Sequence, residues 1–263
     1  MNHDVNTLIN QAVLEIIAHT GSTEKLDMMN HKHAMKIHFI PSKYRVFGGL
    51  IQSMNIQFGN FIEVLMSLII ENEDKYEILT NYSGNRNNNF QLSQMNDKRI
   101  DEYITHCQIG VPASDNEFSK LLQTIVEDTD TNLLSFKHDI DLLFRDKETN
   151  KIYYMEIKYN DDHDTGKYID INRKFIKTYA YLTKEFQIEK ADDLVPILFF
   201  FTNKKLKINP YIPEVPNIKR GKAFFDEFLS LSYEEVEQCM NQLSESPLVK
   251  QMFDDLYQTV MDL

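Results

Sequence analysis

Cysteine, long apolar runs and positive charge are all scarce in this sequence. Its 263 residues include only Cys107 and Cys239, too few for a disulfide framework and in keeping with a reducing compartment. The longest apolar run, Ile197 to Phe201, is far shorter than the roughly 20 residues that cross a bilayer, so we expect no membrane segment. Met1 to Asn10 lacks the basic and apolar pattern of a secretory signal. We therefore expect a cytoplasmic protein.

The shortage of positive charge is uneven along the chain. The formal net charge is −12, and a protein of that charge repels nucleic acid as a whole. Residues 131–190 are nevertheless neutral, and residues 202–222 carry six basic side chains against one acidic. Residues 223–263 carry one basic against nine acidic side chains. A site for a polyanion is therefore expected between about residues 137 and 222.

The composition that remains is that of a globular protein with a sizeable core, because 42% of the residues are hydrophobic and 26% are charged. Apolar residues at helical spacing predict helices over 5–17, 58–70, 97–107, 115–128, 233–243 and 248–263. Gly48-Gly49 predicts a break before the second of these helices. A short strand is expected at 76–81, and the Asn-rich segment 81–89 is typical of a loop.

The segment after Asn132 has the most regular pattern. Residues 138–144 and 152–158 predict two antiparallel strands, joined by a polar turn at 146–150. A helix over 168–186 and a buried strand over 194–202 follow. This order predicts an α/β fold in a single domain over residues 1–263, with a mixed central sheet flanked by helices and with extra N- and C-terminal helices.

The two predicted strands carry a group of charged side chains. Residues two apart on a strand point to the same face, so Asp139 and Asp141 share one face, and Glu156 and Lys158 share another. Antiparallel pairing brings carboxylates and an ammonium together, and carboxylate oxygens are ligands of Mg²⁺. A Glu-x-Lys alone is usually a solvent-facing pair. The acidic strand before it and the helix and buried strand after it favour metal-assisted hydrolysis of a phosphodiester.

The same residues resemble a known family of nucleases. Asp141 and the triplet Glu156-Ile157-Lys158 lie fifteen residues apart, as in the PD-(D/E)xK superfamily. The segments FKHDIDLLF, YYMEIKYNDDHDTGK and DINRKFIKTYAYL resemble type II restriction endonucleases, and YRVFGGLIQSMNIQFGNFIEVL and PILFFFTNKK extend this resemblance to enzymes of the HinfI or TdeIII kind. The sequence departs from the motif in having no proline before Asp139 or Asp141, and it leaves open which of these two is the main ligand. Asp141 is preferred, because an apolar run follows it.

The resemblance implies a role for each residue. Asp141, Glu156 and Ile157, with Asp139 as an additional ligand, would hold Mg²⁺, and Lys158 would position the attacking water and offset charge on the phosphate. Glu63, on the apolar helix before the sheet, matches a family glutamate that lines the metal site; the alternative is a partly exposed helix residue. The resemblance also places the catalytic core at about residues 43–205, followed by C-terminal helices over 222–263.

Several side chains are candidate contacts to DNA. The basic candidates lie on the helix after the motif and beyond the buried strand, and the Asn-rich segment adds two more. A solvated surface or a plain turn is the alternative for each of them. The candidates are Lys167, Arg173, Lys174, Lys204, Lys205, Asn85 and Arg86.

Two clusters of polar side chains, one acidic and one of histidines, are interpreted as structural. The acidic cluster that begins at Asp161 lacks the spacing of a calcium loop and is expected to shape the loop beside the site. His31, His33 and His38 are interpreted as part of a solvated segment rather than a zinc site, because lysines surround them and no cysteine lies nearby.

The sequence therefore predicts a type II restriction endonuclease that cuts both strands of a short palindromic double-stranded DNA sequence with Mg²⁺, as part of a restriction-modification system. The alternatives are a structure-specific repair or recombination nuclease and a non-catalytic DNA-binding protein on the same fold. A homodimer is expected, because a two-fold sequence calls for two equivalent sites. Its interface could be an apolar stripe on the last helix, or that stripe could pack onto the core of its own chain; the stripe comprises Leu248, Met252, Leu256 and Val260.

Overall fold

The structure is a computed structural model that describes residues 2–110 and 112–263, except for the side chains of residues 2–4, 85 and 87. Contacts between residues divide the chain into two compact units. One, which we call the helical unit, comprises the residues up to Leu65 together with Leu231–Leu263. The other, the α/β unit, is Met66–Ser230. A single domain over the whole chain stays a prediction.

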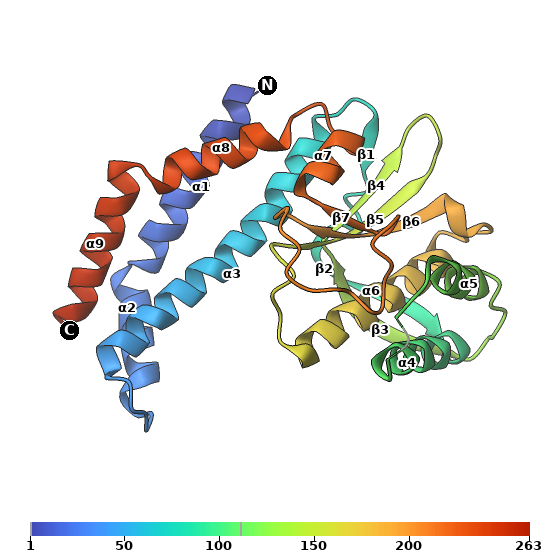
Figure 1. The fold of residues 1–263 in the computed structure, drawn as a ribbon, viewed down its shortest axis with the longest axis horizontal. Coiled ribbons are helices and arrows are strands. Elements are labelled where there is room, and N and C mark those ends of the chain that lie inside the picture. The colour runs from blue at the N-terminus through green and yellow to red at the C-terminus, as the bar shows by residue number, and fades with distance from the viewer. Residues whose placement is uncertain (1, 111) are drawn as a thin grey trace. The chain divides into compact units, whose positions relative to one another are not determined.

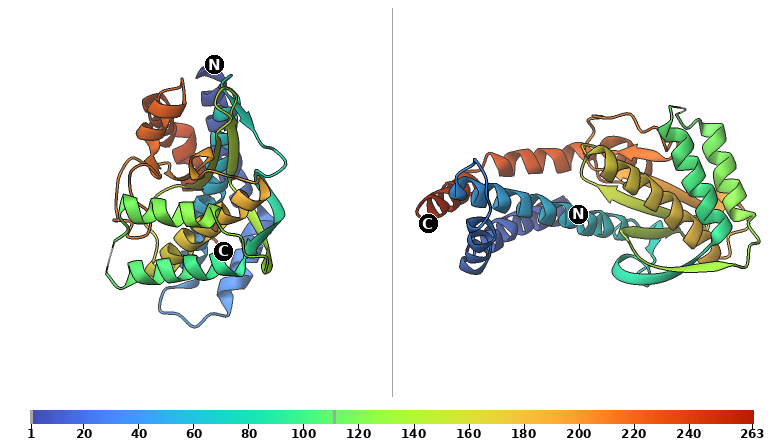
Figure 2. Two further views of the ribbon diagram at one scale, coloured as in Figure 1. Left: turned by 90° about the vertical axis from the view of Figure 1, so that its right-hand side faces the viewer. Right: turned by 90° about the horizontal axis from the view of Figure 1, so that it is seen from below.

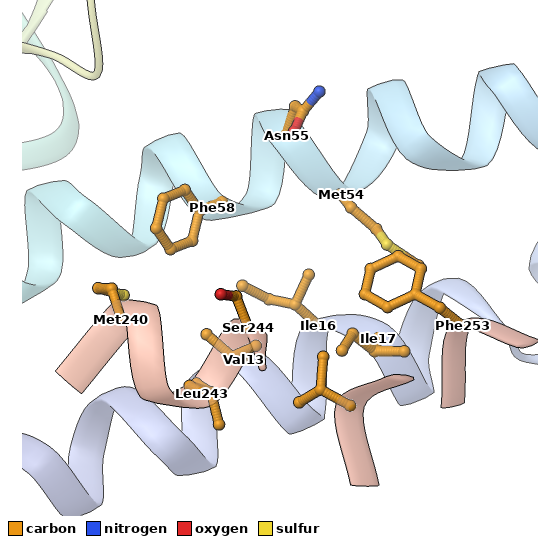
Figure 3. Close-up of a pocket in the computed structure, with 11 residues that line it drawn as sticks. Val13, Ile16, Ile17, Met54, Asn55, Phe58, Met240, Leu243, Ser244 and Phe253 are labelled. Atoms are coloured by element: carbon orange, nitrogen blue, oxygen red, sulfur yellow. The ribbon is translucent and has the colours of Figure 1, made fainter. Parts of the chain in front are cut away.

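The helical unit is built from α1 (Asn2–Thr20), α2 (Thr23–Ala34), the first part of α3 (Ser42–Glu71), α8 (Tyr233–Ser244) and α9 (Pro247–Met261) (Figure 1). Buried apolar residues such as Ile9, Leu50 and Val260 form its core. A cavity of about 250 Å³ lies between α1, α3, α8 and α9, and its lining is mainly apolar (Figure 3). The helix α2, capped by Ser22, was not predicted from the sequence and contains His31 and His33.

Helix α3 is longer than the sequence predicts, because Gly48 and Gly49 do not break it. A glycine inside a helix costs only about 1 kcal/mol relative to alanine, and the apolar residues on both sides outweigh that cost. Gly49 also permits close packing of α2: a Cβ atom at this position would lie 3.1 Å from Nε2 of His33. Gly49 thus accommodates a neighbouring helix, whereas a Cβ atom at Gly48 would meet open space.

Among the described residues, one helix, α3, meets the length and composition of a membrane-spanning segment. An 18-residue window of α3 has a mean hydropathy of 1.3, and 39% of that window is buried. This is weak support for a membrane segment, because the core helix of a soluble protein passes the same test. The high mean hydropathy of α3 comes from apolar residues at helical spacing, with polar residues between them, and not from one continuous apolar run.

The α/β unit contains a five-stranded mixed sheet in the order β1-β4-β5-β6-β7. Its strands are β1 (Tyr76–Ile78), β4 (Leu142–Asp146), β5 (Ile152–Lys158), β6 (Leu194–Phe200) and β7 (Ile218–Arg220). The first three are antiparallel, with Leu143 opposite Tyr154, and β5, β6 and β7 are parallel, with Glu156 opposite Leu198. This arrangement confirms the predicted α/β fold with a mixed central sheet flanked by helices.

Helices cover both faces of this sheet. On one face α6 (Thr165–Glu185) packs on β5, where Phe175 stacks on Tyr154 with ring centroids 5.3 Å apart. Figure 2 shows α4 (Gln94–Gln108) and α5 (Asp115–Val126) alongside α6. On the other face α7 (Gly221–Phe228) places Phe224 against Phe199 of β6 at 4.9 Å. A 3-10 turn at Ala191–Asp193 leads into β6.

Two predictions for the chain around the sheet are wrong. The Asn-rich segment is not a loop throughout, because β2 (Gly84–Ser93) begins within it and pairs with β3 (Leu133–Ile140). The buried residues Phe90 and Leu92 supply the packing that asparagine-rich sequence alone does not indicate. The predicted strand 138–144 is also two strands, since β3 belongs to this separate two-stranded sheet and β4 to the five-stranded one.

Candidate active site

Asp141 lies where the chain passes from one sheet to the other. Ile140 pairs with Gly84 in the two-stranded sheet, and Leu142 pairs with Met155 in the five-stranded one. Asp141 is a bend between them and its carboxylate reaches β5, where the Ile157 N–H donates to Oδ2 at 2.7 Å. The prediction that Asp139 and Asp141 share one strand face is therefore wrong. Asp139 lies on β3, and its role as a ligand stays a prediction.

Three oxygen atoms surround the ammonium of Lys158. Its Nζ lies 2.8 Å from Oε1 of Glu156, 3.2 Å from Oδ2 of Asp141 and 2.7 Å from the carbonyl oxygen of Ile157. The first two contacts are ion pairs and all three are within hydrogen-bond distance. The structure thus brings together four of the residues that the sequence singled out, on β5 and at the bend before β4.

Most of each charged side chain is withdrawn from water. The exposed fractions are 22% for Lys158, 15% for Asp141 and 11% for Glu156. Burial lowers the pKa of Lys158, but the carboxylates of Glu156 and Asp141 outweigh it, and the net pKa lies above its usual value. Lys158 is therefore an ammonium throughout the physiological pH range, and its charge compensates the paired carboxylates.

Tyr154 is a site residue that the sequence reasoning missed. Its hydroxyl donates to Oε2 of Glu156 at 3.1 Å, so the two oxygens of Glu156 are held separately, one by Tyr154 and one by Lys158. Tyr154 is completely buried, and burial, followed by the charge of Glu156, raises the pKa of its phenol, which stays protonated as a donor. The sequence does contain a signal for Tyr154. Because side chains two apart on a strand share a face, Tyr154 lies on the same face as Glu156 and Lys158.

Two half-buried histidines flank the site and were also missed. Burial lowers the pKa of His138; Lys174 and Lys158 lower it further, against the opposing charge of Glu156. Burial likewise lowers the pKa of His163, together with the charge of Lys167 and then of Lys158. Neither Nε2 atom has a hydrogen-bond partner among the described residues. The signal in the sequence was position alone: His138 precedes Asp141 by three residues and His163 follows Lys158 by five.

The site offers oxygen donors of the kind that bind a divalent metal. No group of three or more His, Cys, Asp or Glu side chains suited to a metal ion occurs in the part of the chain that the structure describes. The predicted ligands, however, are two carboxylates and a main-chain carbonyl, and these three oxygens converge on one point that the Lys158 ammonium occupies. Oxygen donors around a cation suit Mg²⁺, which keeps several waters and takes few protein ligands.

Asp161 fixes the loop that follows β5. Its side chain is fully buried and accepts hydrogen bonds from the N–H groups of Leu206 at 3.1 Å and Lys207 at 3.2 Å. It also pairs with Nη2 of Arg220 at 3.0 Å. These contacts join the segments after β5 and β6 to the last residue of β7, which agrees with the interpretation of the acidic cluster as a loop-shaping element.

The candidate DNA contacts differ in how free they are. Arg173 pairs with Asp101 and Asp170, each at 3.1 Å, and Lys205 pairs with Glu214 at 2.8 Å. Lys205 is nevertheless exposed, as are Lys167, Lys174, Lys204 and Arg86. Arg86 donates from Nε to the Ser83 carbonyl at 3.1 Å. The side chain of Asn85 lies outside the described residues.

Glu63 stays a prediction. It is half-buried on α3, in the part of this helix that belongs to the helical unit, between the buried residues Ile62 and Leu65. This environment agrees with a position at the edge of a packed face, and its proposed role beside a metal is untested.

Comparison with known proteins gives one family. Residues 1–244 match the family model described as "Type II restriction endonuclease, HinfI". The type II restriction enzyme HinfI of Haemophilus influenzae is 56% identical over 262 residues, covering 99% of this chain and 99% of that enzyme. No solved structure matches the chain.

Proposed function

This chain belongs to the HinfI family of type II restriction endonucleases, and we propose that it hydrolyses both strands of a short palindromic double-stranded DNA sequence at the site around Asp141, Glu156 and Lys158. It is a restriction enzyme that cleaves DNA at specific sites. The observation that supports the catalytic assignment is the convergence of both carboxylates and a main-chain carbonyl on the Lys158 ammonium.

Each residue at the site has a distinct task in this proposal. Asp141, Glu156 and the Ile157 carbonyl hold Mg²⁺, with Asp139 as an additional ligand. Bound Mg²⁺ supplies a Lewis acid that polarises the phosphodiester and lowers the pKa of a bound water. Lys158 orients the attacking water and offsets the charge that develops on the phosphate oxygens. Tyr154 and the Ile157 N–H keep the two carboxylates in place.

Binding of double-stranded DNA involves the basic surface beside the site. Lys167 and Lys174 are exposed and their charges act on His163 and His138, so they lie near the catalytic residues. Together with Lys204 they are free to contact phosphates, which position DNA without reading its sequence. Arg173 and Lys205 contribute less in this proposal, because each already has a carboxylate partner.

The same proposal includes a homodimer, because one chain carries one Asp–Glu–Lys set and a palindrome has two equivalent cleavage sites. It also includes a cytoplasmic location. The predicted interface on α9 is less suited to this task than expected. Leu256 and Val260 are buried and Met252 is half-buried, whereas Leu248 is exposed. Most of that stripe therefore packs within its own unit, the alternative that the sequence left open.

Plasmid cleavage with and without Mg²⁺ tests the function directly. Discrete fragments that appear only with Mg²⁺ are expected. Fragments limited to branched or damaged DNA would instead indicate a repair or recombination nuclease. Retention of the plasmid in a gel without any cleavage would indicate a non-catalytic DNA-binding protein. Sequencing the fragment ends then gives the recognition site.

A further inference from the structure

The connection between α2 and α3 exposes three large apolar side chains close together. Residues 35–41, which we call the α2–α3 connection, are all exposed. The exposed fractions are 81% for Met35, 104% for Ile37 and 92% for Phe39, and Figure 1 shows the connection extending past the ends of both helices. Single exposed apolar residues are ordinary, but a cluster of them marks a binding surface.

Positive charge is concentrated around the same connection. The two segments of the helical unit, residues 1–65 and 231–263, contain twelve Asp or Glu side chains and six Lys or Arg side chains. Four of the six basic side chains lie between residues 28 and 62, where the sequence has no Asp or Glu. They are Lys32, Lys36, Lys43 and Arg45. The acidic surplus in the rest of the unit conceals this basic segment in any average over the unit.

Three of these cations lie near one another. Burial lowers the pKa of His33, and the charges of Lys36, Lys32 and Arg45 lower it further, so all three cations lie close to one imidazole. Lys32 and Lys36 are exposed, and neither has a carboxylate partner among the described residues. Their charges are therefore available to an anionic ligand.

Hydrogen bonds fix the conformation of the connection. The Arg45 guanidinium donates from Nη1 to the carbonyl of Lys36 at 3.1 Å, and the Ile40 N–H donates to Nδ1 of His38 at 2.9 Å. The rings of His38 and Phe39 are stacked, with centroids 4.9 Å apart. A defined backbone thus presents the exposed side chains, and a surface that is already ordered loses little conformational entropy when it binds.

We propose that the α2–α3 connection binds double-stranded DNA, with Lys32 and Lys36 on backbone phosphates and with Ile37 and Phe39 in a groove. Phosphate contacts position a protein on the duplex, and groove contacts reach the bases. Apolar side chains suit a groove because they contact thymine methyl groups or wedge between base steps. This contact deepens the proposed function and rests on it only in taking DNA as the ligand.

Charge favours DNA over a membrane surface as the partner. A unit with twice as many carboxylates as cations repels a polyanion over most of its surface, so DNA that approaches the helical unit is attracted at this basic segment. The chain belongs to a family that cleaves DNA, so a polyanion is already its substrate. Anionic lipid also attracts basic and apolar residues, but a few apolar side chains on a short connection anchor a protein only weakly.

DNA binding by the full chain tests the two lysines. The assay is fluorescence anisotropy with a duplex that contains the cleavage site, in Ca²⁺ to prevent cutting. Lys32→Gln/Lys36→Gln is expected to bind about tenfold more weakly, and the slope of log affinity against log salt concentration should fall by about two. Lys25→Gln/Lys250→Gln is the matched control, because it removes the same charge from the same unit outside the basic segment. The control is expected to keep the wild-type slope.

The apolar side chains call for a different result. Ile37→Ser and Phe39→Ser are each expected to weaken binding by about tenfold without changing the salt slope, because they remove apolar contact and no charge. Leu248→Ser is the control, since Leu248 is a 57% exposed apolar residue on α9 of the same unit. Unfolding in urea is expected to be the same for all three variants and wild type, because exposed side chains seldom affect stability.

A cross-link supplies a positive result. Cys107 and Cys239 are both buried, so Ile37→Cys adds an accessible thiol to the connection. A duplex that carries an activated disulfide on a short tether is expected to capture this variant: the thiolate attacks the disulfide, a protein–DNA disulfide forms and the small thiol leaves. Leu248→Cys is expected to stay uncaptured.

The outcomes separate this inference from the proposed function. Wild-type affinity and salt slope in Lys32→Gln/Lys36→Gln overturn the contact, and they leave the proposed function intact if the enzyme still cuts a specific site. Lys158→Ala is expected to bind DNA through the connection without cutting it, so loss of cleavage alone bears only on the catalytic assignment. Binding of wild type to phosphatidylserine vesicles that is lost in the lysine variant, with DNA affinity unchanged, would identify a membrane contact and overturn the inference.

Discussion

The two units of this molecule differ in what they bury. Among the residues that the structure describes, Thr20 is the single buried polar side chain of the helical unit, and every other one lies in the α/β unit. Burying a polar group is unfavourable unless it is hydrogen-bonded, and burying a charge is more so. The helical unit is therefore a conventional apolar bundle, whereas the α/β unit places paired polar groups where geometry has to be fixed.

The buried polar groups of the α/β unit hold the loops and turns around the catalytic strands. Asp146 accepts from the N–H groups of Glu148 and Thr149, both at 2.9 Å, and closes the turn between β4 and β5. The Asn209 side chain donates to Oδ1 of Asn172 on α6 at 2.7 Å and accepts from the Tyr211 N–H at 2.9 Å. Apolar burial thus assembles both units, while paired polar burial occurs in the α/β unit, where the position of side chains matters for chemistry.

The largest effect is expected at the centre of the α/β unit. Asp141→Ala, Glu156→Gln and Lys158→Ala should each reduce cleavage by a factor of about 10² to 10³, since the two carboxylates would hold the metal and Lys158 acts on the charge that develops on the phosphate. Initial rates of plasmid cleavage in Mg²⁺ measure this loss.

Binding in Ca²⁺ distinguishes the roles of these residues. Lys158→Ala is expected to keep specific DNA affinity, because the ammonium acts more on the transition state than on the ground state. A loss of affinity that matches the loss of rate would make Lys158 a phosphate anchor. Near-normal cutting by Glu156→Gln would show that this is not the active site.

Stability should respond most strongly at Asp161. Asp161→Ala leaves the Arg220 guanidinium without this buried partner and two N–H groups without acceptors. We expect a loss of about 3 kcal/mol or more in the free energy of unfolding, measured in urea. Glu214→Ala is the control, since Glu214 also contacts Arg220, at 3.5 Å, but is partly exposed. Equal losses in the two variants would contradict the special weight given to buried polar pairs.

A smaller effect should appear as a pH dependence. The folded-state pKa of His138 is lowered, first by burial and then by Lys174. The unfolded chain takes up a proton at about pH 6.5, so the free energy of unfolding should fall as the pH falls from there through the lower folded pKa. His138→Gln is expected to reduce this fall, in urea titrations between pH 7.5 and pH 5. Identical slopes for wild type and variant would show that His138 is not protected from protonation.

The smallest effect is expected in the helical unit. Thr20 accepts a hydrogen bond from Nε2 of Gln57 at 3.0 Å, and Gln57 also donates to the Ser53 carbonyl at 3.4 Å. Thr20→Val keeps the shape and removes one net hydrogen bond, so about 1 kcal/mol should be lost from the free energy of unfolding. A loss as large as that of Asp161→Ala would mean that the two units do not differ in the way described.

The sequence predicted the elements that periodicity determines. The strand β5, the α6 crossover and the buried strand β6 were expected close to their observed bounds, and with them the positions of Glu156 and Lys158. The family resemblance supplied the choice of Asp141, which the structure places in contact with Ile157 and Lys158. These predictions succeeded because alternation along a strand fixes which side chains share a face.

Features that depend on distant partners were not predictable in this way. The bend at Asp141 exists because β3 and β4 pair with different strands, and the run of residues 138–144 contains no proline or glycine to signal it. Gly48 and Gly49 suggested a break, whereas the observed helix continues and packs against His33. The closeness of His138 to Glu156 likewise results from packing between the two sheets.

Ile157 takes part in the site through its main chain. Its N–H donates to Asp141 and its carbonyl accepts from Lys158, while its side chain is buried among apolar neighbours. The middle position of the Glu-x-Lys triplet is therefore free to vary among buried apolar residues without changing the groups presented to DNA. Proline is the exception, because it has no N–H to give to the carboxylate. Substitutions at position 157 are therefore limited by the need for a main-chain N–H and by the space in the core. The charges of Glu156 and Lys158 on either side place hardly any limit on them.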